Sequence, residues 1–171
     1  MNDAMKTKEG EYALYFEKYV NHTAGQDISN LLINQIDELR QYCSLKTEGW
    51  FLRPYQEGKW SPKELIGHLI DTDRVFAYRA LCIARGEQEN LPGFDENAYV
   101  ENSDFNALSI DSLLEEFEMS RKSLRSMVIN LSTEALARSG MVNGNLMTCR
   151  ALLTIVPGHF IHHMGILKER Y

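Results

Sequence analysis

Apolar side chains recur every three or four positions along four long segments of this sequence. This spacing places them on one face of an α-helix, and that face has to be buried against another element. The segments run from Asp27 to about Leu45, from Ser61 to Ala84, from Ile110 to Asn130 and from about Thr148 to Arg170. No segment has a strong strand pattern, so the sequence predicts an all-α four-helix bundle.

The second segment has the clearest helix ends. Ser61-Pro62-Lys63-Glu64 is a capping box with proline at the first helical position, and Gly86 suits the left-handed residue that ends a helix. Glu87–Leu108 is then a long connection between the second and third helices, and Ser139–Asn145 is predicted to be a loop. Glu11–Tyr19 fits either a short helix or an extended segment laid over the bundle.

Composition limits the kinds of protein that this chain can be. Its 171 residues fit a single domain, so we expect one domain over residues 1–171. The 24 acidic residues outnumber the 18 Lys and Arg, which argues against nucleic-acid binding. No apolar run has the length of a membrane span, and Met1–Tyr12 does not resemble a signal peptide. Cys43, Cys82 and Cys149 lie far apart, as expected for reduced thiols in a cytoplasmic protein.

Three of the five histidines lie in the last predicted helix. His159 and His163 are four residues apart and therefore share a helix face, the arrangement with which two imidazoles bind one metal ion. His162 points to a different side, although the pair His159/His162 is a sterically allowed alternative. Pro157 precedes this group and predicts a kink, because proline removes one backbone hydrogen bond from a helix.

A fourth histidine, His68, lies in an otherwise apolar run of the second helix, from Leu65 to Ile70. A buried imidazole needs hydrogen-bond partners or a metal ion. A single such histidine is more often a hydrogen-bonded core residue, and a bundle whose histidines bind no metal remains one alternative. Three inward-facing histidines fit a catalytic metal site better, because such sites often combine three protein ligands with a water. The sequence therefore predicts a metal site formed by His68, His159 and His163.

Several charged side chains surround His68 in the sequence. Glu64 and Asp71 are candidate catalytic helpers, either as general bases or as partners of the imidazole. For Glu64 the alternative is a role in the helix cap, and for Asp71 it is a surface carboxylate. Ordinary ion pairs are the interpretation for four others: Asp73, Arg74, Arg79 and Arg85.

Three stretches of the chain, GKWSPKELIGHLIDTDRVFAYRALCIARGE, LPGFDENAYV and GHFIHHMGILKERY, resemble the DinB-like superfamily of damage-inducible-type proteins. The resemblance covers about Tyr15 to Tyr171 and is greatest to a branch with metal-dependent hydrolases and bacillithiol transferases. It implies an up-down-down-up four-helix bundle. It also implies a metal triad with one histidine from the second helix and an H-x-x-x-H pair from the last. The matching residues are His68, His159 and His163, and His162 matches an additional histidine that is not a ligand.

These observations predict a metal-dependent enzyme that activates water or a low-molecular-weight thiol. It would act on a small molecule as a hydrolase or as a thiol S-transferase. Imidazole ligands suit zinc or nickel best, and the resemblance leaves open a homodimer. The alternative is a non-catalytic stress-response bundle that binds a metal or a small molecule. A metal position open to a cavity would favour the enzyme, whereas a fourth protein ligand would favour a structural site.

Overall fold

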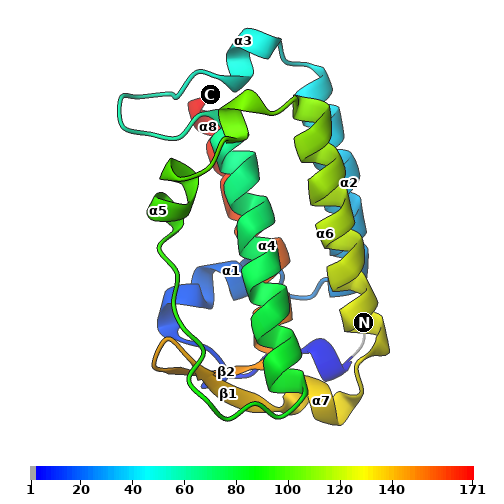
Figure 1. The fold of residues 1–171 in the computed structure, drawn as a ribbon. Coiled ribbons are helices and arrows are strands. Elements are labelled where there is room, and N and C mark those ends of the chain that lie inside the picture. The colour runs from blue at the N-terminus through cyan, green and yellow to red at the C-terminus, as the bar shows by residue number, and fades with distance from the viewer. Residues whose placement is uncertain (1–2) are drawn as a thin grey trace.

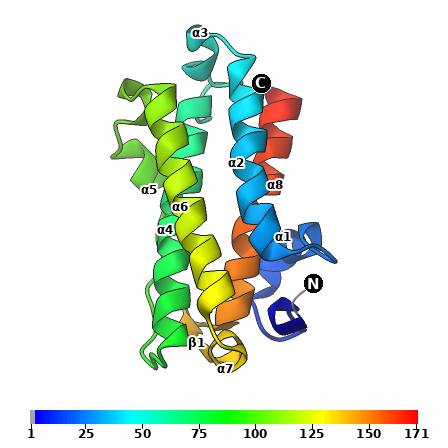
Figure 2. The same ribbon diagram turned by 90° about the vertical axis from the view of Figure 1, so that its right-hand side faces the viewer.

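The computed structural model describes residues 3–171, in which four long helices pack side by side (Figures 1 and 2). These helices are α2 (Ile28–Ser44), α4 (Pro62–Ala84), α6 (Ile110–Asn130) and α8 (Cys149–Arg170). In Figure 1, α2 runs up toward the end of the bundle where α3 lies, α4 and α6 both run down, and α8 runs up again. The predicted all-α four-helix bundle with up-down-down-up topology is therefore confirmed.

Side chains at the helix starts explain where the long helices begin. The backbone N–H of Glu64 donates to Ser61 Oγ at 3.2 Å, and the N–H of Ser61 donates to Glu64 Oε2 at 2.7 Å, which completes the predicted capping box. Gly86 follows α4 with a φ of 90°, the left-handed conformation that glycine adopts without strain. Side-chain oxygens also cap α2, α6 and α8, from Asp27, Ser109 and Thr148 respectively.

Short elements fill the connections between the long helices. They are α1 (Glu17–His22), α3 (Glu48–Phe51), α5 (Glu96–Glu101), α7 (Thr133–Ala137) and three 3-10 turns at Asp3–Met5, Leu14–Phe16 and Phe105–Ala107. The segment whose structure the sequence left undecided is thus partly helical. The long connection between α4 and α6 carries α5 and returns along the outside of the bundle (Figure 1).

The prediction of a loop at Ser139–Asn145 is wrong, because this segment forms most of a β-hairpin. Strand β1 (Ser139–Val142) pairs with β2 (Asn145–Thr148) in an antiparallel register. Asn143 and Gly144 form the turn with φ values of 49° and 75°, which suits the Asn-Gly dipeptide. The backbone of Leu91 bonds to the same hairpin, through Met141 O at 2.9 Å and Asn143 N at 2.8 Å.

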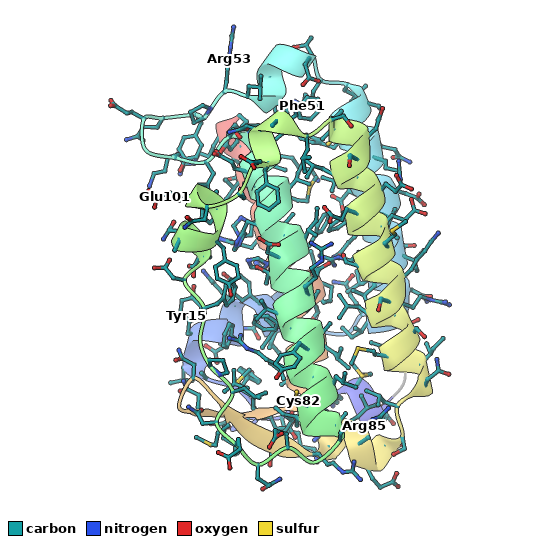
Figure 3. The ribbon with its side chains drawn as sticks, in the orientation of Figure 1. Tyr15, Phe51, Arg53, Cys82, Arg85 and Glu101 are labelled. Carbon is teal, nitrogen blue, oxygen red and sulfur yellow. The ribbon has the colours of Figure 1, made fainter. Side chains whose placement is uncertain are left out.

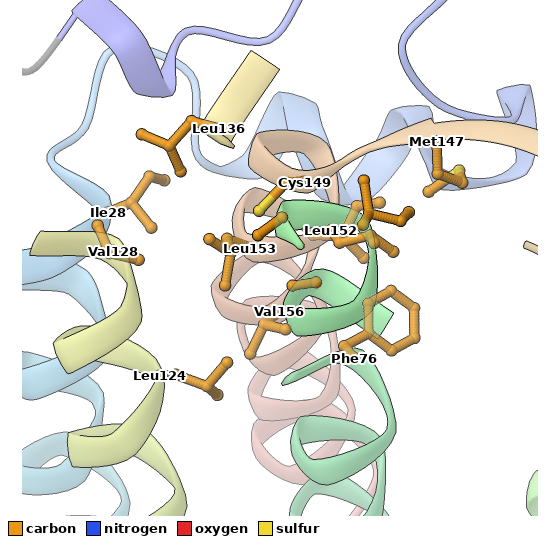
Figure 4. Packing of buried hydrophobic residues seen from close by; sticks show 14 of the residues in the cluster. Ile28, Phe76, Leu124, Val128, Leu136, Met147, Cys149, Leu152, Leu153 and Val156 are labelled. Carbon is orange, nitrogen blue, oxygen red and sulfur yellow. The ribbon is translucent and has the colours of Figure 1, made fainter. Parts of the chain in front are cut away.

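Two apolar clusters divide the core along the bundle axis. One cluster, near α7, includes Phe76, Leu124 and Val156, as Figure 4 shows. The other includes Leu69 and Phe160 and extends to Phe51 of α3. Figure 3 shows Phe51 at this end of the molecule and Arg85 at the opposite end. Each long helix contributes to both clusters, and each has at least one buried polar residue between its two contributions.

A buried polar layer therefore separates the two clusters. It includes Gln35 of α2, Asp73 of α4, Arg121 of α6 and two of the candidate metal ligands, His68 and His159. The ion pair Asp73–Arg121 joins α4 to α6, with 2.8 Å between Oδ2 and Nε. The Asp73 carboxylate can be fully buried because the Arg121 guanidinium offsets the free-energy cost of removing its charge from water. The polar layer places the candidate site at the middle of the bundle.

The last helix continues through its proline. All residues of α8 from Cys149 to Arg170 are helical, including Pro157. Within residues 3–171, none of the helices combines the length and the apolar character that crossing a membrane requires.

Candidate metal centre

The structure brings the imidazoles of His68, His159 and His163 together. The Nε2 atom of His159 lies 3.1 Å from Nε2 of His68 and 2.9 Å from Nε2 of His163. The three donor atoms all lie within 4.8 Å of one another. His159 and His163 come from successive turns of α8, and His68 faces them from α4, which packs antiparallel to α8.

Burial keeps these three side chains neutral. It lowers the pKa of His68 to about 4. Burial and the neighbouring imidazoles lower the pKa of His163 to about 3, and they lower that of His159 well below its usual value. A neutral imidazole offers a lone pair to a metal ion, whereas an imidazolium does not. All three side chains are therefore in the protonation state that a metal ligand needs at neutral pH.

The donor set fits a tetrahedral or related transition-metal site. Zinc–nitrogen bonds of about 2.0–2.1 Å require ligand nitrogens roughly 3.3 Å apart in a tetrahedron, close to the two separations found for His159 Nε2. Among residues 3–171, no thiol and no carboxylate joins the three imidazoles in this group. The group could therefore hold an ion through three protein ligands and leave the rest of its coordination open.

Ring contacts orient the imidazoles. Tyr19 of α1 packs edge-on against His159, with ring centroids 5.3 Å apart, and Trp60 lies against His68 at 4.7 Å. The Nδ1 atoms of His159 and His163 have no hydrogen-bond partner among the described residues. No hydrogen bond to Nδ1 from a described residue therefore orients these two rings.

A glycine permits the close contact between α1 and α8. A Cβ atom at Gly158 would overlap the backbone carbonyl of Tyr19, so only glycine allows α1 to lie this close. In Figure 2, α1 lies beside the lower half of α8. The glycine next to His159 therefore holds the Tyr19 ring against the candidate ligand.

The imidazoles lie in the wall of a cavity of about 520 Å³, a size typical of small-molecule sites. Its wall comes from α1, α4, α8, the connection between α4 and α6, and the β-hairpin. In Figure 1 the connection with α5 and the hairpin gather on the left side of the bundle, beside α4 and α1. The candidate metal centre is thus open to a space that a small molecule can occupy.

The two predicted helper carboxylates do not line this cavity. Glu64 accepts the N–H of Ser61 in the capping box. Asp71 Oδ1 lies 3.8 Å from Arg74 Nη1. Burial and the nearby Glu116 raise the pKa of the Asp71 carboxyl, and together they outweigh the opposite effect of Arg74. Neither placement supports a direct role for these carboxylates at the imidazoles.

Several cavity residues were missed by the sequence interpretation. Trp60 and Arg79 both line the cavity, and the ordinary ion pair predicted for Arg79 is wrong, because no described carboxylate pairs with it. Thr72 lines the cavity too, and its buried hydroxyl has no hydrogen-bond partner among the described residues. For Thr72 and Arg79 the detectable signal is helical spacing, because residues 68, 72, 76 and 79 share one helix face.

Comparisons with known proteins agree with this architecture. A model of the DinB superfamily matches residues 31–167. A curated protein of Oceanobacillus iheyensis, named "Putative metal-dependent hydrolase", is 23% identical over 118 residues, or 68% of this chain and 67% of that protein. Among solved structures, YfiT from Bacillus subtilis is described as "a probable metal-dependent hydrolase with an unusual four-helix bundle topology". Its TM-score is 0.73 at 18% identity, covering 96% of this chain and 90% of that one.

Proposed function

The chain belongs to the DinB superfamily, and we propose that it is a metal-dependent enzyme whose three-histidine site activates water or a low-molecular-weight thiol. One observation carries the proposal. Three neutral imidazole donors converge in the wall of a cavity, and no fourth protein ligand joins them among the described residues. This arrangement suits a reaction centre better than a closed structural site. The name of the Oceanobacillus relative supports hydrolysis as the reaction class.

In this proposal His68, His159 and His163 bind the ion, and zinc or nickel suits the imidazole set. When bound, a divalent ion supplies Lewis acidity that lowers the pKa of a water or of a thiol. The protein holds its donors in place through Trp60 and Tyr19. A water or thiol activated in this way would form a bond to an electrophilic carbon of a small molecule while the bond from that carbon to its leaving group breaks, which would give hydrolysis or S-transfer.

A thiol used in transfer would come from outside the chain. Cys43 and Cys149 are buried, and burial raises the pKa of each thiol to about 12. These two thiols therefore stay protonated and do not act as nucleophiles at neutral pH. Cys82 is the third cysteine and is not part of the cavity wall.

His162 is the best-placed proton acceptor in the proposed site. It lines the cavity, and its ring centroid lies 5.1 Å from that of His163. Partial burial, the nearby Lys18 and the neighbouring His22 lower its pKa. The His162 imidazole is then neutral at neutral pH and can accept a proton from the attacking group.

The test uses the full chain without a histidine tag, stripped of metal and then given one equivalent of Zn²⁺ or Ni²⁺. Wild type should gain hydrolysis of p-nitrophenyl esters or transfer of a small thiol to an electrophilic bimane. His159→Ala should gain neither activity and retain no metal, whereas His162→Ala should retain metal but turn over more slowly. Absence of metal binding in wild type, or equal activity with and without metal, would contradict the proposal.

A further inference from the structure

Among residues 3–171, one of the buried Lys and Arg side chains has no carboxylate partner. Residues 3–171 contain four buried Lys or Arg residues, namely Lys63, Arg79, Arg121 and Arg150. Three of them pair with a carboxylate, in the ion pairs Lys63–Glu48, Arg121–Asp73 and Arg150–Glu11. Arg79 has no carboxylate of the described residues within ion-pair distance, although its exposed fraction is only 5%. An unpaired buried charge costs stability, so its presence requires an explanation.

The surroundings of Arg79 hold its guanidinium group without neutralising it. Nη2 donates to the carbonyl oxygen of Pro92 at 2.7 Å. The guanidinium carbon lies 5.4 Å from the ring centroid of Phe76 and 5.5 Å from that of Phe94. These contacts hold the guanidinium group in place, but a carbonyl and two aromatic rings are weaker partners for a buried cation than an anion is.

Arg79 belongs to the same cavity as the imidazoles. Both Arg79 and His68 line it from α4, and their separation of eleven positions corresponds to about three turns, or roughly 16 Å along the helix. Thr72, with its unpartnered hydroxyl, lies between them on this face. The cavity thus has a cluster of metal-type donors at one position and an unpaired cation at another.

The other charges in the cavity wall do not neutralise Arg79. Lys18 is a second cation, and Glu96 is the one carboxylate among the described lining residues. Neither Glu96 nor any other described acid forms an ion pair with Arg79. The net charge of the chain is −6, so its overall field does not attract anions and the local cation would have to do so.

We propose that Arg79 binds a carboxylate group of the small molecule that occupies this cavity. The inference rests on the proposed function, because it takes the molecule bound in the cavity to be the substrate of the enzyme. The planar guanidinium matches a carboxylate in two parallel hydrogen bonds. Phenyl rings next to Arg79 favour a singly charged group with an apolar body, since a more highly charged anion would lose more hydration on entering. The substrate class is therefore an elongated organic carboxylate whose reactive end lies at the imidazoles.

The test compares two probes of nearly equal shape, 4-phenylbutanoate and 4-phenylbutanamide. Their binding to the full chain is measured by calorimetry or ligand-observed NMR in metal-free buffer, because a metal ion would itself bind a carboxylate. Wild type should bind the carboxylate about tenfold more tightly than the amide, as a charge-assisted hydrogen bond suggests. Arg79→Gln should bind both probes equally, and Arg79→Lys should keep part of the preference. Arg74→Gln is the matched control, because it removes the same charge from the exposed side of α4.

Three results would overturn the inference. They are equal binding of both probes by wild type, a preference that survives in Arg79→Gln, and no binding of either probe. The wild-type comparison remains decisive if the Arg79 variants fail to fold. Because no metal and no turnover is involved, metal-dependent activity without a carboxylate preference would refute only this inference. A preference that depends on Arg79 in a protein without activity would refute only the proposed function.

Discussion

The side-chain amide of Gln35 on α2 donates a hydrogen bond of 2.9 Å to the backbone carbonyl of Pro157 on α8. The carbonyl oxygen of the same amide accepts a hydrogen bond from Arg121 Nη1 at 2.5 Å. Arg121 in turn pairs with Asp73. A continuous chain of buried polar groups therefore leads from α4 through α6 and α2 to the backbone two residues before His159. This chain connects the segment of α8 around Pro157 to α2.

Replacing Gln35 should test this link. Gln35→Met removes both hydrogen bonds and leaves Arg121 Nη1 and the Pro157 carbonyl without this partner in a buried site. We expect the free energy of unfolding to fall by about 1–3 kcal/mol, as measured by urea denaturation, and metal affinity to weaken. Gln41→Met on the exposed side of α2 is the control and should change little. Equal stability of the two variants would show that the Gln35 contact is unimportant.

Neighbouring histidines should differ in their effect on metal content. His163→Ala removes one of the three converging donors, so the protein should retain much less zinc or nickel after dialysis. His162→Ala leaves the three Nε2 atoms in place and should retain about as much metal as wild type. Elemental analysis by mass spectrometry on untagged protein measures both. A larger loss in His162→Ala would instead favour the alternative pair His159/His162.

The two glycines of α8 provide a matched test of the contact with α1. Gly158→Ala would overlap the Tyr19 carbonyl, so α1 must move and stability should fall by about 1–3 kcal/mol. A Cβ atom at Gly165 would meet nothing within 4 Å. Gly165→Ala should therefore leave stability unchanged or raise it by up to about 1 kcal/mol, because alanine favours helix. Thermal and chemical denaturation measure the stability of both variants. Unchanged stability of Gly158→Ala would contradict the close contact between α1 and α8.

The ion pair between Glu11 and Arg150 should make part of the stability dependent on pH. Burial raises the pKa of the Glu11 carboxyl, but hydrogen bonds from Arg150 and from the Lys8 N–H outweigh it, and the net pKa lies below 4.5. A carboxylate with a lowered pKa in the folded state stabilises the protein above its unfolded pKa. That contribution is lost as the pH falls through the folded value.

The stability difference between wild type and Glu11→Gln should consequently be constant from about pH 7 to pH 5 and shrink below 4.5. Urea denaturation at a series of pH values measures it. Glu9→Gln, at an exposed position two residues earlier, should be nearly neutral in stability. A difference that grows on acidification would have the wrong sign and would exclude this role for the ion pair.

Local signals in the sequence predicted the elements whose determinants lie close together along the chain. The capping box at Ser61, the glycine after α4 and the i, i+4 spacing of His159 and His163 all depend on helix geometry alone. The β-hairpin was missed because its strands are four residues long and too short for a reliable alternation pattern. Its Asn143-Gly144 turn was the available signal.

Helical periodicity and the resemblance to a family thus determined the four long helices and the candidate ligands. Only the tertiary structure decided that Asp73 is a buried partner of Arg121, that Gln35 contacts Pro157, and that Arg79 lacks a carboxylate. Whether a charged side chain meets solvent, an opposite charge or a cavity depends on the residues of other helices that face it. Those residues lie dozens of positions away, and the spacing along one helix cannot identify them.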